Sequence, residues 1–311
     1  MFQLFKDTNY DFIGKRRWAY LLSAAFIAVG LISVGLRGGL KYGIDFTGGT
    51  LIQVRFEKTS RVDTIRRALD RIKLGDSIIQ EFGDPREFIL RLPLQDAPAE
   101  EVTRRVQGAL AAEPALGRVE IRRVEFVGPQ VGRDLQIQAL YAVLASAIGI
   151  LIYIAIRFDY RGGVAAILAT FHDVLVTFSA MSLTDREISL PVLAAFLTII
   201  GYSVNDTIVA FDRVRENRGK GVRKGMSFRE LMNTSINQTL SRTVLTSLTT
   251  FMSTIILFLF GGKVLEDFAF VLTVGVITGT FSTIYVAGAI LVDWNAWVEA
   301  RAHRSKAVAK A

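Results

Sequence analysis

Polar residues recur at helical spacing inside two stretches of the chain that are otherwise apolar. In the first, the spacing i, i+4, i+7 and i+8 places four side chains on one helix face: Thr198, Tyr202, Asn205 and Asp206. The second repeats this pattern with Arg242, Thr246, Thr249, Thr250 and Ser253. An acid near a basic residue in apolar surroundings can take up and release a proton. We therefore predict that Asp206 and Arg242 form a proton relay.

The same spacing allows a structural interpretation of these charges. A buried ion pair between Asp206 and Arg242 could hold two helices together, and Arg242 alone could extend its charge to the lipid headgroups. A further apolar stretch carries a third stripe, made of Thr170, Asp173 and Thr177 with His172 beside them. For His172 and Asp173 we favour a structural hydrogen-bonded pair over a role in the relay.

The composition shows what kind of protein must position these residues. The chain has 311 residues, of which 51% are hydrophobic and 21% charged, and its mean hydropathy is +0.36. Uncharged runs alternate with short basic stretches, which is typical of a polytopic membrane protein. This excludes a soluble enzyme, a disordered chain and, with no cysteine present, a disulfide scaffold. It also argues against nucleic acid as the partner of the basic excess.

Six segments are long enough to cross a membrane as helices, which takes about 20 residues. They are residues 18–36, 135–156, 162–184, 188–211, 243–262 and 268–292. We expect the first to be an uncleaved span, because it is longer than the apolar part of a signal peptide and no clear cleavage site follows. In the last, Gly275 and Gly279 form a GxxxG pattern, which predicts close helix packing.

The basic residues predict the orientation of these spans. The two tails and the loops on their side of the membrane carry 17 Lys and Arg residues, whereas the short loops on the other side carry only Arg186 and Lys263. Positive charge collects on the cytoplasmic side, so both termini are expected there. Because the fourth and fifth spans meet at that side, Asp206 and Arg242 are expected at similar depth.

We expect three parts in the chain: residues 1–36 as a tail and first span, 37–134 as an extracytoplasmic α+β domain, and 135–311 as the remaining five spans with a basic loop and tail. Within 37–134, alternating and helical patterns predict the order βαββαβ. This is the ferredoxin-like arrangement. The domain has no histidine, no cysteine and no nucleophile beside a base, so we expect contact or movement rather than catalysis.

Ordered motifs along the chain match a known pattern. They are Gly43-Ile44-Asp45-Phe46-Thr47-Gly48-Gly49, Val127-Gly128-Pro129-Gln130-Val131-Gly132, Arg157-Phe158, Phe171-His172-Asp173-Val174, Gly201-Tyr202-Ser203-Val204-Asn205-Asp206-Thr207, Phe211-Asp212-Arg213 and Ser241-Arg242-Thr243. Over nearly its whole length the chain thereby resembles the SecD/SecF family of protein-export membrane proteins, within the resistance-nodulation-division superfamily.

The resemblance implies a subunit that works with a separate SecD partner, the SecYEG channel and exported preproteins in the bacterial inner membrane. It implies that the proton motive force drives late steps of export, with Asp206 and Arg242 as the relay. Supporting polar residues would be Asn205, Tyr202, Thr246, His172 and Asp173. It implies no cofactor beyond the coupling ion, a proton or a sodium ion. Membrane lipids are the remaining expected partner.

Two other functions remain open at this point. The chain could be half of a small-molecule or lipid exporter of the same superfamily, although such exporters normally carry two six-span halves and larger external domains. It could also be a passive scaffold that holds other translocase subunits. An enzyme is not expected, because no span or loop assembles a nucleophile, a base and oxyanion donors.

Overall fold

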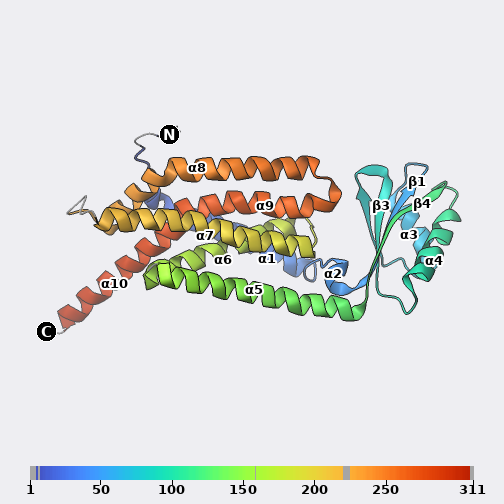
Figure 1. Ribbon diagram of the computed structural model, residues 1–311, viewed down its shortest axis with the longest axis horizontal. Coiled ribbons are helices and arrows are strands. Elements are labelled where there is room, and N and C mark those ends of the chain that lie inside the picture. The colour runs from blue at the N-terminus through green and yellow to red at the C-terminus, as the bar shows by residue number, and fades with distance from the viewer. Residues whose placement is uncertain (1–4, 6–7, 158, 220–224, 309–311) are drawn as a thin grey trace.

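The computed structural model describes residue 5 and residues 8–157, 159–219 and 225–308. Within these residues six helices are long and apolar enough to cross a membrane, and they form a bundle with a small sheet domain at one end (Figure 1). The six predicted spans are therefore confirmed. Phe158 and five of the counted basic residues lie outside the described residues: Lys6, Lys220, Arg223, Lys224 and Lys310.

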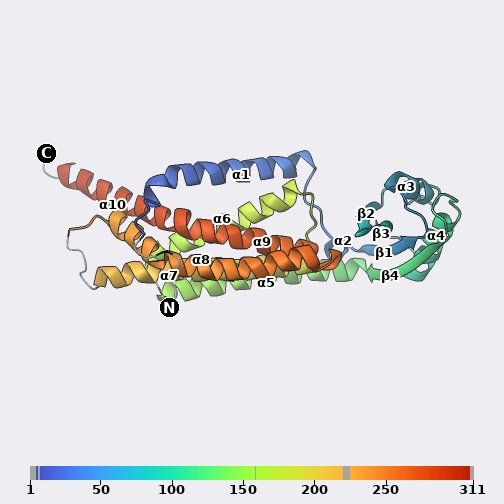
Figure 2. The ribbon, with the colours of Figure 1, turned by 90° about the horizontal axis from the view of Figure 1, so that it is seen from above.

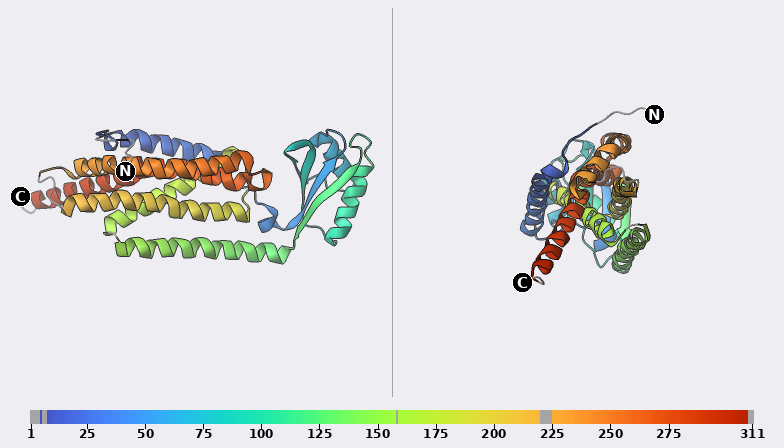
Figure 3. Two further views of the ribbon diagram at one scale, coloured as in Figure 1. Left: turned by 45° about the horizontal axis from the view of Figure 1, so that its top comes forward. Right: turned by 90° about the vertical axis from the view of Figure 1, so that its left-hand side faces the viewer.

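The bundle helices differ in how deeply they are buried. They are α1 (Arg16–Leu36), which follows the short turn η1 (Ile13–Lys15), α5 (Pro129–Arg157), α6 (Tyr160–Leu183), α7 (Leu190–Gly219), α8 (Phe228–Phe260), and α9 (Lys263–Ser282), which continues through the π-helical turn η2 (Thr283–Ala287) into α10 (Gly288–Val308). Between 39% and 56% of the apolar window is buried in α6, α7 and the α9–α10 helix, but only 6–17% in α1, α5 and α8. The first group forms the interior, while α1 and α5 lie on opposite outer sides (Figures 2 and 3).

Small residues allow the interior helices to approach closely. A Cβ atom added at Gly275 of α9 would lie 2.1 Å from Ile199 of α7, and one at Gly30 of α1 would lie 2.1 Å from Ser179 of α6. A residue larger than glycine at either position would force atoms of the neighbouring helix to move. The predicted close packing at the GxxxG pattern is confirmed.

Two bundle helices, α7 and α8, are longer than the sequence predicts. The fourth predicted span ends at residue 211 and the fifth begins at residue 243, yet α7 continues to Gly219 and α8 begins at Phe228. Ser227 and Glu230 form a capping box that starts α8 well before its apolar part. Because apolarity marks only the part of a helix that lies in the lipid, polar extensions of the same helix are missed.

The sheet domain has the predicted order βαββαβ. Its elements are β1 (Gly49–Phe56), α3 (Val62–Asp70), β2 (Ile78–Phe82), β3 (Asp84–Leu92), α4 (Ala99–Ala111) and β4 (Val119–Val127). The strands form one antiparallel sheet in the order β2-β3-β1-β4, and the ferredoxin-like arrangement is confirmed. Alternate residues Ile52, Val54 and Phe56 of β1 are buried in the domain core with residues of α3 and α4.

A short helix that the sequence did not predict precedes the sheet. It is α2 (Ile44–Thr47), and it lies within the glycine-containing motif between α1 and β1. Four residues are too few for helical periodicity to be recognised. The second domain helix, α4, ends at Ala111, and the chain turns through Pro114 before it enters β4. The expected domain limits at residues 37 and 134 stay a prediction.

Candidate functional site in the helix bundle

Asp206 lies in the interior of the bundle on α7. Its side chain is buried, with 4% of the residue exposed, and it accepts a hydrogen bond of 3.4 Å from the Ser247 hydroxyl of α8. The Ser247 oxygen is also approached by the Tyr202 hydroxyl at 3.1 Å and by the Thr280 hydroxyl of α9 at 2.7 Å. Three helices therefore meet at one hydroxyl group beside a buried carboxyl group.

Arg242 is not joined to this cluster by a hydrogen bond or ion pair among the described residues. Its side chain is exposed on α8, and among the described residues no ion pair joins it to Asp206. Asp206 is level with Ser247, which lies five residues deeper along α8 than Arg242, or about 7.5 Å at 1.5 Å per residue. The sequence places the two residues at similar depth by counting from the predicted ends of the fourth and fifth spans. Because α7 and α8 both continue beyond those ends, this count does not fix the depth. The two residues nonetheless lie on neighbouring helices.

A second polar cluster surrounds Asp173 of α6. This side chain is fully buried and accepts hydrogen bonds from Ser203 of α7 and, at 2.7 Å, from Ser282 of α9. His172 contacts the same carboxyl group through its Nδ1 atom at 2.9 Å. The His172 Nε2 atom is buried and has no hydrogen-bond partner among the described residues. The expected contact between His172 and Asp173 is thus present, together with two serines that the sequence did not single out.

The missed hydroxyl residues carry a weak sequence signal. Ser203 lies three residues before Asp206, and Ser282 and Thr280 interrupt an apolar helix near the GxxxG pattern. A serine or threonine is common in membrane helices because its hydroxyl can bond to its own backbone. Sequence alone therefore could not separate these residues from the many hydroxyl groups that bond only within their helix.

The predicted stripe on α7 and α8 faces outward over part of its length. The exposed members are Thr198, Gly201 and Asn205 of α7 and Arg242, Thr246, Thr249 and Ser253 of α8. The hydroxyl groups bond to carbonyl oxygens of their own helices, as Thr198 does to Ala194. Within the described residues, the side chains of Asn205 and Arg242 have no hydrogen-bond partner. We call these seven residues the outer polar stripe.

The motif at residues 43–49 joins the sheet domain to α7, and we call it the glycine joint. The Asp45 carboxylate accepts a hydrogen bond of 2.9 Å from the Leu190 N–H, at the first turn of α7. The Gly43 N–H donates to the Ile188 carbonyl oxygen at 2.8 Å, directly before that helix. The helix that carries Asp206 is therefore tied at its other end to the chain that enters the sheet.

The glycines of this joint occupy positions that other residues would strain. Gly49 has a φ of 130°, and a Cβ atom there would lie 2.4 Å from the Leu92 carbonyl oxygen of β3. Gly48 has a φ of 70°, and its backbone lies so close to α5 that a Cβ atom on Gly132 would be 3.2 Å from its nitrogen. Backbone of β3 and α5 thus packs directly against the joint.

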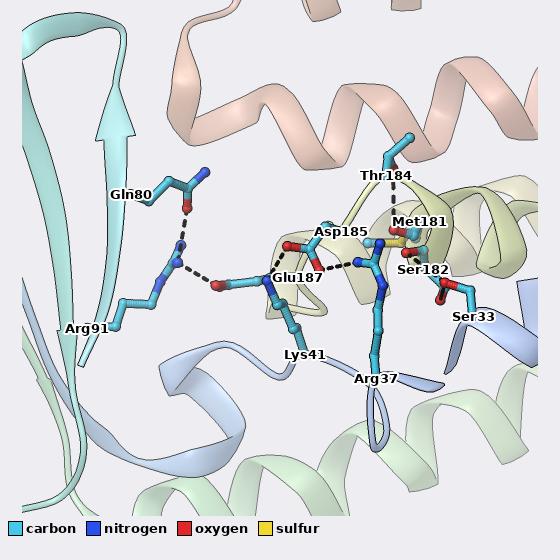
Figure 4. A network of polar contacts seen from close by, with 10 residues as sticks. All are labelled: Ser33, Arg37, Lys41, Gln80, Arg91, Met181, Ser182, Thr184, Asp185 and Glu187. Atoms are coloured by element: carbon cyan, nitrogen blue, oxygen red, sulfur yellow. Dashed lines mark hydrogen bonds and ion pairs between the residues drawn. The ribbon is translucent and has the colours of Figure 1, made fainter. Parts of the chain in front are cut away.

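The loop between α6 and α7, residues 184–189, holds a network of ion pairs (Figure 4). Glu187 pairs with Arg91 of β3, while Asp185 pairs with both Arg37 and Lys41 after α1. Burial raises the pKa of Glu187, and the Arg91 guanidinium acts in the opposite direction. The hydrogen bond from Lys41 holds the pKa of Asp185 below its ordinary value. This loop therefore links the sheet and the first span to both helices that carry buried aspartates.

The same loop also contacts the beginning of α9. Arg186 pairs with Glu266 and Asp267, and its guanidinium lies 4.2 Å from the centre of the Phe270 ring. Within the described residues, no group of three or more histidine, cysteine, aspartate or glutamate side chains could hold a metal ion. The interior of the bundle therefore holds two buried carboxyl groups, Asp173 and Asp206, each hydrogen-bonded to hydroxyl groups of neighbouring helices.

Two family descriptions match the chain. Residues 109–297 match the family described as "Protein export membrane protein SecD/SecF, C-terminal", and residues 38–60 match the "SecD/SecF GG Motif". The second match includes the glycine joint.

Similar proteins carry one description. The "Protein translocase subunit SecF" of Calditerrivibrio nitroreducens is 44% identical over 286 residues, which cover 92% of this chain and 94% of that protein. The protein with the same description from Escherichia coli O157:H7 is 39% identical over 286 residues, which cover 90% of this chain and 86% of that protein.

Two solved structures have a similar fold. The crystal structure of SecDF from Thermus thermophilus, described as a translocon-associated membrane protein, has a TM-score of 0.81 and 41% identity over 93% of this chain. A structure of SecDF in a super-membrane-facing form has a TM-score of 0.68 and 39% identity over 98% of this chain. This chain spans 39% and 41% of the lengths of those chains.

Proposed function

The chain belongs to the SecF branch of the SecD/SecF family of protein-export membrane proteins, and from this we propose that it assembles with a SecD partner and uses the proton motive force to promote export. It is a multi-pass translocase subunit rather than an enzyme. The finer steps proposed below concern the coupling ion, the partner surface and the path from proton binding to movement.

The observation that carries the proton proposal is the setting of Asp206. An ionisable residue inside a membrane span is costly and is rarely kept without a role. The Asp206 carboxyl group is buried between three helices, and among the described residues it has a hydrogen bond only from Ser247. Gain or loss of its proton changes the charge at this point, and the packing of α7, α8 and α9 around it must respond.

Arg242 would act as the basic partner of Asp206 in another arrangement of the helices. In this structure it is exposed on α8 and unpaired within the described residues. A small rotation or shift of α8 against α7 would change its distance to the Asp206 carboxyl group. The electrostatic balance at Asp206 would change with it, which is how a helix movement and a proton transfer can be coupled.

The outer polar stripe supports a SecD partner. The Asn205 amide and the Arg242 guanidinium face away from the bundle with no described partner, and lipid chains offer no hydrogen bonds to such groups. Polar groups on a membrane helix are instead satisfied across helix–helix contacts. We infer that a helix of SecD covers this stripe. This chain spans only about two fifths of the SecDF chains that it resembles, and a separate SecD partner would supply the remainder.

The connection to the sheet domain supports a mechanical output. Asp45 of the glycine joint bonds to the start of α7, and Glu187 beside that helix pairs with Arg91 of the sheet. A shift of α7 that follows proton binding at Asp206 would be passed directly to the domain. The basic residues predict that both termini lie in the cytoplasm, which places the sheet domain on the opposite side of the inner membrane. There the domain would act on preproteins that leave the SecYEG channel.

The deciding experiment is export by vesicles that contain Asp206→Asn, measured with and without a proton gradient. We expect normal insertion but no stimulation of export by the gradient, because the amide cannot bind and release a proton. The matched control is Asp134→Asn, the same change at an exposed carboxyl group at the start of α5. Full stimulation in the Asp206 variant would favour a passive scaffold and remove the relay.

A further inference from the structure

A cavity of about 840 Å³ lies at the end of the bundle that carries both termini, away from the sheet domain (Figure 1). Its lining residues come from the ends of α5 and α7, the beginnings of α6 and α8, and α10. Four arginines line it: Arg157, Arg161, Arg215 and Arg218. Two carboxylates also line it, those of Asp159 and Glu299, so the lining carries a net positive charge.

Two of the four arginines have partners inside the protein. Arg157 pairs with Asp212 at 2.6 Å, and Arg161 donates to the Asn295 side-chain oxygen at 2.7 Å. For Arg215 and Arg218, in contrast, no ion pair or hydrogen bond with a described residue is present. A guanidinium group carries five N–H donors in a fixed fork that fits the oxygens of a phosphate group. The cavity therefore offers two such forks to an anion.

Apolar side chains make up much of the rest of the lining. They are those of Phe211, Val214, Phe228, Leu231 and Leu291. The cavity also reaches Ile156 at the end of α5, which is 82% exposed on the outer surface of the bundle. An apolar side chain exposed at the end of a spanning helix faces lipid, so the cavity opens toward the membrane.

We propose that this cavity binds an anionic phospholipid, with its phosphate held by Arg215 and Arg218 and its glycerol and upper acyl chains against Phe228 and Leu231. A free phosphate would satisfy the two arginines but would leave the apolar walls uncovered. A phospholipid offers a phosphate to the arginines and acyl chains to the apolar side chains of the lining. Basic pockets between membrane helices bind acidic headgroups by this same chemistry.

The test uses the full chain purified with its partner in detergent and titrated with dioctanoyl phosphatidylglycerol, with bound lipid counted by native mass spectrometry. The double variant R215Q/R218Q should bind this lipid roughly thirtyfold more weakly, at about fivefold for each arginine near a membrane surface. The control K15Q/R17Q removes two exposed charges at the same end of the bundle but outside the cavity, and should change binding less than twofold.

Two further arms identify the source of the phosphate and the role of its charge. Dioctanoyl phosphatidylethanolamine, which has no net charge, should bind at least tenfold more weakly than the anionic lipid. Inorganic phosphate at millimolar concentration should neither bind nor displace the lipid. Equal weakening by both double variants, equal binding of the two lipids, or displacement by inorganic phosphate would each overturn the proposal. None of these outcomes depends on whether Asp206 carries protons.

Discussion

At the scale of single residues, Ser247 is the centre of the Asp206 cluster. Its hydroxyl donates to Asp206 and lies within hydrogen-bond distance of Tyr202 and Thr280. A hydroxyl has one proton to donate and two lone pairs to accept with, so all three contacts can form at once. The position of Asp206 relative to α8 and α9 therefore depends on this one side chain.

We expect Ser247→Ala to reduce the gradient-driven part of export while leaving export without a gradient unchanged. Asp206, Tyr202 and Thr280 would lose a shared partner in the membrane, and an unsatisfied buried polar group costs about 1–3 kcal/mol. The measurement is vesicle export together with the thermal unfolding midpoint. Thr278→Ala is the control, because that hydroxyl lies outside both the cluster and the outer polar stripe and bonds to Val274 of its own helix. Equal behaviour of the two variants would contradict the role given to Ser247.

At the scale of helices and loops, the glycine joint and the loop at residues 184–189 hold the sheet domain to the bundle. The joint contacts β3 and α5 through backbone, and it reaches α7 through Asp45. The loop adds the pairs Glu187–Arg91 and Asp185–Lys41. Both connections end at α6 or α7, the helices that carry the buried aspartates. The sheet domain is therefore attached to the same helices that form the polar clusters.

The Asp45 carboxylate satisfies an N–H group at the start of α7 that has no partner within the helix. Asp45→Ala should therefore lower stability by about 0.5–2 kcal/mol, the usual effect of losing a helix cap. Asp45→Asn keeps an acceptor oxygen and should lose less. Thermal unfolding of the purified complex checks the order of the two variants. We also expect Asp45→Ala to weaken gradient-driven export, and an export rate equal to that of the unchanged protein would argue against coupling through the joint.

The pairs made by Asp185 predict a dependence on pH. Its pKa is lowered in the folded protein, so the stability it contributes is complete above the ordinary aspartate value of about 3.9 and is lost as pH falls through the lowered value. Because nearly half of the side chain is exposed, we expect less than about 1 kcal/mol. Unfolding midpoints of Asp185→Asn and the unchanged protein should differ at pH 7 and converge near pH 3. A difference that is the same at both pH values would rule out this link.

At the scale of the whole molecule, the bundle has one polar side and several apolar ones. The outer polar stripe runs along α7 and α8, whereas α5 presents large apolar side chains such as Tyr153 and Ile156. Lipid suits the second surface but not the first. We propose that SecD covers the first surface, so that the two subunits meet close to the buried Asp206.

The absence of cysteine from the sequence makes this surface easy to test. The variant Thr249→Cys should form a disulfide crosslink in native membranes with a cysteine introduced into a membrane helix of the SecD partner. A cysteine at Tyr153, on the apolar face of α5, should not crosslink to that partner. The measurement is the mobility of the crosslinked product on a denaturing gel. Crosslinking from Tyr153 alone would place the partner on the other side of the bundle.

Local patterns were sufficient for the architecture of this protein. Apolar runs predict the six spans, because any such run of about 20 residues can satisfy its backbone in lipid only as a helix. Alternation and turn residues predict the order βαββαβ, and the spacing of Tyr202, Asn205 and Asp206 predicts a shared helix face. Each of these signals lies within a short segment, so it can be recognised without knowing how the segments pack.

Only the tertiary structure decided which polar groups meet. Ser203 and Ser282 reach Asp173 from helices 30 and 109 residues away, and Ser247 reaches Asp206 from 41 residues away. Such contacts depend on the rotation and depth of each helix against its neighbours, which apolarity leaves open because every face of an apolar helix suits lipid. For the same reason the sequence could not show that the Arg242 side chain is exposed while that of Asp206 is buried. The sequence by itself determined the helices and the polar residues on them, and the packing of those helices decided which of these polar groups lie in contact.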